Sequence, residues 1–187
     1  IDGEEGLAAI AADFGVSWAQ ERVIAAGGAR LVCATLWTDL ELGGGRAANE
    51  AQLPARLNDY RFIRNAGAGY RRIVPADTVS VHRRHRDFVT RTLAEPFDGR
   101  TIVVTHHAPH PSVLGRRERD LPAAFASDLS AILEGPHAPE LWLFGHAHDA
   151  RSGRVGRTDL RSVALGYPDD VAEADIAARL GRGLLDA

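Results

Sequence analysis

Apolar residues in this 187-residue chain occur in short runs, and the spacing within each run predicts an element of secondary structure. Residues 21–37 form two apolar runs divided by two glycines, a pattern typical of a β-hairpin with a tight turn. Residues 75–97 carry apolar side chains at near-helical spacing, which predicts a helix of about four to five turns. Continuous apolar runs at 100–106 and 140–145 indicate buried strands, and residues 121–135 between them predict an amphipathic helix. Strand, helix and strand in this order form a βαβ unit, so we predict an α/β fold with buried central strands.

The remaining segments give weaker patterns. Acidic residues before an Ala/Leu/Ile repeat predict a short helix within residues 2–16, because negative charge is favourable at a helix N-terminus. Alternating residues predict a second hairpin at 153–166, and a last helix is expected at 169–185. The Gly, Ala and Asn residues of 41–52 are typical of a loop, whereas residues 57–72 show no clear period and predict no element.

Composition indicates a globular domain, because 45% of the residues are hydrophobic and 25% are charged. No internal repeat or long linker divides the chain, so we expect residues 1–187 to form a single domain. The chain has no methionine, even at position 1, and we therefore expect this domain to be incomplete at its N-terminus. No apolar run reaches the roughly 18 to 20 residues that span a bilayer, and Cys33 has no partner for a disulfide. These features predict a cytoplasmic protein without membrane contact.

The charge pattern argues against a nucleic-acid partner. The net charge is −3 and the isoelectric point is near 6.2, so there is no general attraction to a polyanion. Arginines gather at residues 82–87 and 115–120, but acidic residues interrupt both runs and aromatic residues are few. We interpret both as solvated surface, and His82 and His85 as part of a basic helix face. The sequence predicts no particular oligomeric state.

Five of the eight histidines follow the two central strands. His106, His107 and His110 come after the first strand, and His146 and His148 after the second. The carboxyl ends of parallel strands open onto the crevice where ligands bind. Alternate side chains of an extended segment face the same way, so His146 and His148 can point together, whereas His106 and His107 must diverge. Neutral imidazole is a common ligand for Zn, Mn and Fe, and the clusters therefore predict a metal site.

Two histidine motifs resemble those of the calcineurin-like metallophosphoesterases. Gly-His-Ala-His at 145–148 is similar to the Gly-His-x-His signature, and Val-Val-Thr-His-His-Ala-Pro at 103–109 to the preceding histidine motif. Three further segments resemble a bacterial branch of the family and extend the similarity to roughly residues 20–168: 34–39, 58–63 and 123–129.

The resemblance implies a β-sandwich of two sheets flanked by helices, with two divalent transition metals (Mn, Fe or Zn) at the strand ends. His106 and His146 would bind one metal and His148 the other, and a bridging hydroxide would attack the phosphorus of a small phosphate ester. Between the adjacent histidines, His106 is favoured because it lies at the strand end. His107 and Asp149 are expected to contact the metals or the substrate indirectly.

The three N-terminal motifs of that family, Asp-x-His, Gly-Asp-x-x-Asp and Gly-Asn-His-Asp/Glu, are absent from this chain. We therefore expect the isolated chain to have weak phosphomonoesterase or phosphodiesterase activity, or none. An alternative is a non-catalytic protein, or one that holds a single metal with His106, His146 and His148 while Asp149 orients His148.

Overall fold

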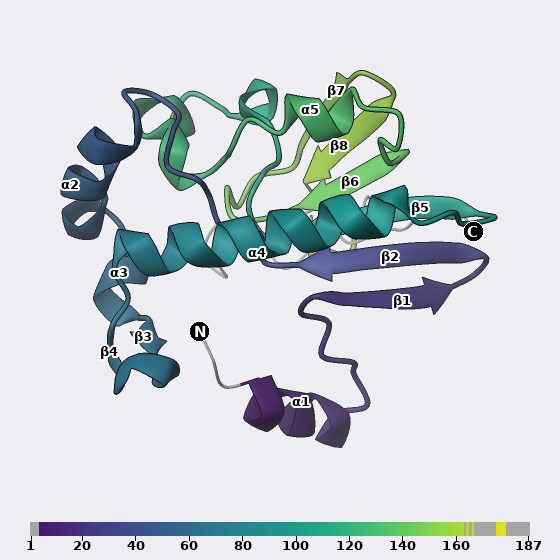
Figure 1. Cartoon of the computed structure of the whole chain (residues 1–187), viewed down its shortest axis with the longest axis horizontal. Coiled ribbons are helices and arrows are strands. Elements are labelled where there is room, and N and C mark those ends of the chain that lie inside the picture. The colour runs from purple at the N-terminus through teal and green to yellow at the C-terminus, as the bar shows by residue number, and fades with distance from the viewer. Residues whose placement is uncertain (1–3, 163, 165, 167–174, 179–187) are drawn as a thin grey trace.

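A mixed six-stranded sheet flanked by helices forms the centre of the protein (Figure 1), seen in a computed structural model that describes residues 4–162, 164, 166 and 175–178. The strand order is β1-β2-β5-β6-β8-β7, and the four inner strands are parallel while the two edge strands are antiparallel to their neighbours. The strands are β1 (Arg22–Ala26), β2 (Ala29–Ala34), β5 (Arg100–Thr105), β6 (Leu141–Phe144), β7 (Arg151–Val155) and β8 (Thr158–Ser162). The predicted α/β class with buried central strands is confirmed.

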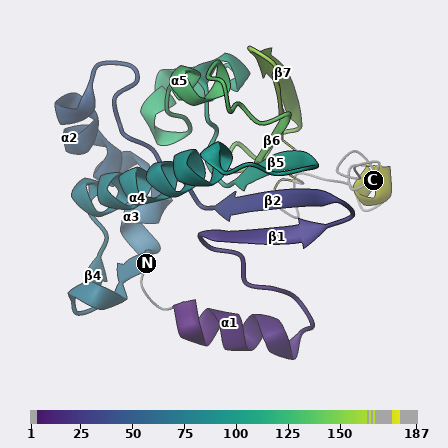
Figure 2. The ribbon, with the colours of Figure 1, turned by 45° about the vertical axis from the view of Figure 1, so that its right-hand side comes forward.

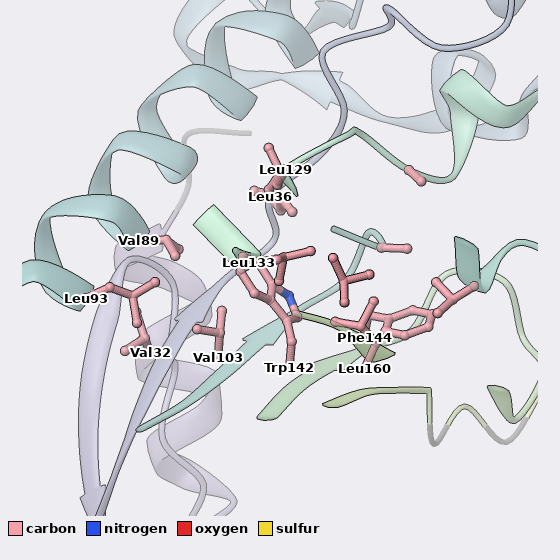
Figure 3. Close-up of a cluster of buried hydrophobic side chains, with 14 of the residues drawn as sticks. Val32, Leu36, Val89, Leu93, Val103, Leu129, Leu133, Trp142, Phe144 and Leu160 are labelled. Atoms are coloured by element: carbon pink, nitrogen blue, oxygen red, sulfur yellow. The ribbon is translucent and has the colours of Figure 1, made fainter. Parts of the chain in front are cut away.

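The core follows one row of paired residues across the four parallel strands. Val32, Val103, Trp142 and Leu160 are successive neighbours in the sheet register, and the solvent-exposed fraction of each is 0%. Figure 3 shows how these side chains meet, with the Trp142 ring at the centre of the cluster. Burial of apolar surface contributes about 25 cal/mol per Å², so burial of this row stabilises the packing of the four strands.

Both predicted hairpins are present in the sheet. The turn between β1 and β2 is formed by Gly27 and Gly28, whose φ values are 55° and 76°. Two consecutive residues with positive φ match the twist of a tight hairpin, and glycine adopts this conformation without steric cost. The second hairpin is formed by β7 and β8, and the end of its predicted range lies partly outside the described residues.

Helix α4 (Pro75–Ala94) covers one face of the sheet, as both ribbon views show (Figures 1 and 2). Its start is fixed by Asp77, whose carboxylate accepts a hydrogen bond from the Val74 N–H at 2.9 Å. Val89 and Leu93 on its inner side pack into the core (Figure 3). The predicted helix is therefore confirmed.

The loop predicted at 41–52 is wrong, because α2 (Arg46–Arg56) begins inside it. Asn49 of this helix is buried, and its amide donates to the Leu40 carbonyl at 2.9 Å and to the Leu42 carbonyl at 2.7 Å. Leu53 is fully buried one turn further on. Tertiary contacts at these two positions thus stabilise a helix that the local composition does not favour.

The amphipathic helix predicted at 121–135 is also wrong for most of its length, because only α5 (Ser130–Leu133) is α-helical. The backbone bonds instead to the loop after β5. The Ala108 N–H donates to the Phe125 carbonyl at 3.0 Å, and the Leu129 N–H to the Pro109 carbonyl at 2.9 Å. These bonds hold the two segments together and position the loop that carries the first histidines.

The other elements lie around the sheet. The predicted N-terminal helix is confirmed as α1 (Glu4–Asp13), and of the last predicted helix only residues 175–178 are described, as helix. The region without a clear period contains α3 (Asn58–Phe62) and a two-stranded ribbon, β3 (Arg64–Asn65) with β4 (Arg71–Arg72). In the described residues this ribbon is the second sheet of the structure. No helix there is long and apolar enough to cross a membrane.

Candidate metal centre

Three parallel strands, β2, β5 and β6, bring their carboxyl ends to the same edge of the sheet. The segments that follow β2 and β6 have an unusual backbone. Leu36 and Trp37 have φ values of 73° and 54°, and His146 and His148 have 52° and 56°. Non-glycine residues with positive φ cost of order 1 kcal/mol or more each, and they cluster at functional sites. The carboxyl ends of these strands are therefore the strongest candidate location for a functional site.

His106 and His146 meet at this edge. The Nε2 atom of His106 and the Nδ1 atom of His146 are 2.9 Å apart, and the ring centroids are 4.8 Å apart. The backbone supports the pair, because the Gly145 N–H donates to the His106 carbonyl at 3.0 Å. Residues 40 positions apart in sequence thus present two ring nitrogens to the same point.

His107 takes the opposite direction from His106, as expected from the strand geometry. His107 is buried, whereas part of the surface of His106 is exposed, and the planes of the two rings differ by 84°. The His107 ring stacks on Trp37 at a centroid distance of 5.0 Å and lies 4.3 Å from the His146 ring. His107 therefore packs on the buried side of the His106–His146 pair and does not face solvent with it.

Burial keeps these imidazoles neutral. It lowers the pKa of His146 to about 3, and charge on His106 and His148 lowers it further. Burial also lowers the pKa of His107 well below its usual value, with contributions from His146 and His106. The pKa of His106 is lowered by burial and by His148, against the opposing effect of the Asp59 carboxylate. Neutral rings keep the lone pairs that a metal requires.

Asp59 is a carboxylate in the surroundings of His106 that the histidine pattern did not reveal. It lies in α3, and its carboxylate is the negative charge that acts on His106. It falls within the Asn-Asp-Tyr-Arg stretch at 58–61, which shows no period and is far from both histidine motifs in sequence. Only the similarity of residues 58–63 to the family pointed towards it.

His82 and His85 correct the predicted basic helix face. Both side chains are fully buried, because they lie on the inner side of α4 against the segment after β2. The Leu36 N–H donates to Nδ1 of His85 at 3.1 Å, and Nδ1 of His82 donates to the carbonyls of Leu36 and Trp37 at 3.2 and 3.3 Å. His82 and His85 thus fix the backbone of the two positive-φ residues, Leu36 and Trp37. The Trp37 ring in turn stacks on the ring of His107.

The other histidines of the pattern are placed differently. The charge of His148 acts on both His106 and His146, so it lies at the same edge of the sheet. The carboxylate of Asp149 pairs with Arg151 at 2.8 Å. The Nδ1 atom of His110 instead shares a hydrogen bond of 2.8 Å with Ser112 in its own loop.

The histidine pair fits part of a metal site. Bonds from a metal to imidazole nitrogen are about 2.0–2.1 Å long, so two such ligands at a right angle lie roughly 3 Å apart. The separation of 2.9 Å between the ring nitrogens of His106 and His146 is that of an N–H···N hydrogen bond, and it is compatible with two ligands of one metal once the shared proton is displaced. Among the residues that the structure describes, however, no three His, Cys, Asp or Glu side chains are grouped closely enough to hold a metal ion. The described chain thus offers two convergent donors and no complete site, and no reaction step through a metal follows from it.

A solved structure with a similar fold is the crystal structure of phosphopantetheinyl hydrolase from Mycobacterium tuberculosis. It superimposes with a TM-score of 0.61 at 17% sequence identity, over 89% of this chain. The chain has the fold of that hydrolase. This agrees with the α/β fold with flanking helices expected from the sequence, whereas the described residues form one six-stranded sheet and a two-stranded ribbon in place of a sandwich of two large sheets. The chain spans 61% of the length of the hydrolase, and neither a family model nor a curated protein matches it.

Proposed function

We propose that this chain belongs to a metal-dependent phosphoester hydrolase of the calcineurin-like type, acting on a small phosphomonoester or phosphodiester. The observation that carries the proposal is the neutral His106–His146 pair, whose ring nitrogens lie 2.9 Å apart at the carboxyl ends of two parallel strands. The shared fold with a hydrolase supports the reaction class. Two divalent ions, Mn, Fe or Zn, are the proposed cofactors.

The roles of the chain's own residues follow from their placement. His106 and His146 would supply nitrogen donors to one metal, and His148 a donor to the second. When bound, such ions neutralise phosphoryl oxygens and lower the pKa of water. His107, buried against Trp37, keeps the His146 ring in place, and Asp59 places a carboxylate near His106.

Metal binding and hydrolysis test the proposal together. The chain is loaded with Mn²⁺, and bound metal is measured by calorimetry alongside hydrolysis of p-nitrophenyl phosphate and bis(p-nitrophenyl) phosphate. His146→Ala is expected to weaken binding by at least roughly tenfold, as loss of metal-site residues typically does. His137→Ala is the matched control, because His137 lies in an exposed loop before β6.

Each outcome has a distinct meaning. Metal binding that depends on His146, with hydrolysis of either ester, supports the phosphoesterase. Metal binding that depends on His146 without any hydrolysis supports the metal role of the histidine pair, and it fits both a chain that carries only part of the metal site and the alternative of a non-catalytic or single-metal binding protein. Equal metal binding by His146→Ala and His137→Ala would refute a role of the histidine pair.

A further inference from the structure

A hollow lies at the opposite edge of the sheet from the histidines. Its volume is about 500 Å³, and its walls are the end of α4, the amino ends of β2 and β5, and the segment before β6. Thr101 lines it and precedes His106 by five residues on β5, a span of about 16 Å at about 3.3 Å per residue. The hollow is thus separate from the candidate metal centre, and its size falls in the range of small-molecule sites.

Arg30 is the central feature of this hollow. The residue is only 7% exposed, although arginine is rarely buried without a partner. Its Nε–H donates to Thr101 Oγ1 at 2.9 Å, and its Cζ lies 5.0 Å from the centre of the Phe97 ring. Within the described part of the chain, no hydrogen bond or ion pair engages its two terminal nitrogens. Four N–H donors of a permanent cation therefore remain for an acceptor in the hollow that Arg30 lines.

The surrounding charges favour an anion. Arg157 also lines the hollow, and the Ala138 carbonyl fixes it by accepting from Nε at 2.9 Å and from Nη2 at 2.7 Å. Of the two carboxylates in the wall, Glu140 is paired with Arg100 at 3.2 Å, which leaves Glu95. Two arginines thus face one uncompensated carboxylate.

An apolar pocket of about 160 Å³ adjoins this charged hollow. The two share Leu93, Ala94, Pro136 and His137, and Ala131 and Ile132 of α5 also line the apolar pocket. A ligand that fills both spaces needs a charged end and an apolar end. Burial of the apolar end contributes about 0.8 kcal/mol for each methylene group, in addition to the charge-assisted hydrogen bonds to Arg30.

We propose that these joined spaces are a binding site for a small amphipathic anion, with a carboxylate or phosphate head at Arg30 and a short alkyl or aryl tail beside Ile132. Arg157 adds a second cation near the head, and the Phe97 ring packs against the Arg30 guanidinium. This site is independent of the proposed phosphoesterase chemistry.

The test uses hexanoate, hexyl phosphate, acetate and hexylamine as probes, in a buffer with EDTA so that the candidate metal centre carries no ion. Binding is measured by calorimetry, and its position by shifts of the Ala94 and Gly99 amide resonances in NMR spectra. The affinities of hexanoate and hexyl phosphate are compared to determine whether a carboxylate or a phosphate head group binds more tightly. We expect at least one of them to bind, acetate to bind at least tenfold more weakly, and hexylamine not to bind.

The variants separate the head from the tail. Arg30→Gln should weaken binding at least tenfold, whereas Arg22→Gln, a matched change of an exposed arginine on β1, should leave it within twofold. Ala131→Phe, at an exposed position in the wall of the apolar pocket, should weaken hexanoate but not acetate. If Arg30→Gln does not fold, Ala131→Phe and the probe series still decide. The proposal is overturned if neither anion binds, if hexylamine binds as well as hexanoate, or if the folded Arg30→Gln protein binds like the wild type.

Discussion

The acid stability of the protein should depend on His85. This imidazole is fully buried in α4 and accepts the Leu36 N–H at 3.1 Å. Burial lowers its pKa from 6.5 to about 4, and the charges of Arg84 and His82 act in the same direction. The carboxylate of Glu21, 3.7 Å from Nε2, does not reverse the effect of burial. The folded protein therefore holds this ring in its neutral form.

The sign of the pH effect follows from this difference. Because the pKa of His85 is lower in the folded state, the unfolded chain takes up the proton first as the pH falls. The stabilisation is complete above about pH 6.5 and decreases as the pH falls towards 4. The pKa of His85 differs by about 2.5 between the unfolded and the folded state. This difference corresponds to a loss in the free energy of unfolding of about 3 kcal/mol at pH 4 and below, and of about 2 kcal/mol at pH 5.

His85→Asn isolates this contribution, because an asparagine oxygen still accepts the Leu36 N–H but does not titrate. The free energy of unfolding is measured by urea denaturation at pH 7 and pH 5. We expect the loss between these two pH values to be about 2 kcal/mol smaller in His85→Asn than in the wild type. His137→Asn, in an exposed loop, should lose as much as the wild type. Identical pH dependence in His85→Asn and the wild type would refute the reasoning.

Three further substitutions test other features. Asp77→Ala removes the carboxylate that accepts the Val74 N–H at the start of α4, and should lower the free energy of unfolding by about 1 kcal/mol in urea; an unchanged midpoint would argue against the cap. Gly28→Ala places a side chain at φ 76° in the first hairpin and should cost about 1–2 kcal/mol, unless the turn adopts another form, which the amide resonances of the turn would report. Trp142→Phe removes the 2.9 Å hydrogen bond to Thr105 and leaves a void, so thermal unfolding should show a loss of roughly 1–3 kcal/mol; no loss would mean that the core repacks fully.

The elements that could be predicted are those whose own residues determine them. Two glycines between apolar runs can form a tight hairpin with little help from the rest of the chain, and the spacing in Pro75–Ala94 matches its buried face. The failures at α2 and at 121–135 have the opposite cause. The Asn49 amide bonds to carbonyls of the loop before its own helix, and the Ala108 and Leu129 amides bond between segments rather than along a helix. Such pairings depend on how loops fold back onto neighbouring segments, which the spacing of apolar residues does not encode.

The candidate site shows the same division. Strand periodicity correctly placed His106 and His107 on different sides and indicated that the histidines follow two neighbouring strands. The metal role of His106, His146 and His148 stays a prediction. Sequence spacing did not predict that His82 and His85 are buried. Their hydrogen-bond partners are backbone atoms after β2, roughly 45 residues away in the chain.

The parallel pairing of β2 with β5 has a consequence for how fast the protein folds. Residues 35–99 separate these neighbouring strands, so their alignment closes a long loop before it gains any contact. The hairpins β1–β2 and β7–β8 close over two residues each and can form early. We therefore expect the slow step to be the docking of the two hairpins through β5 and β6, and the edge that carries His106 and His146 to form only when that step is complete.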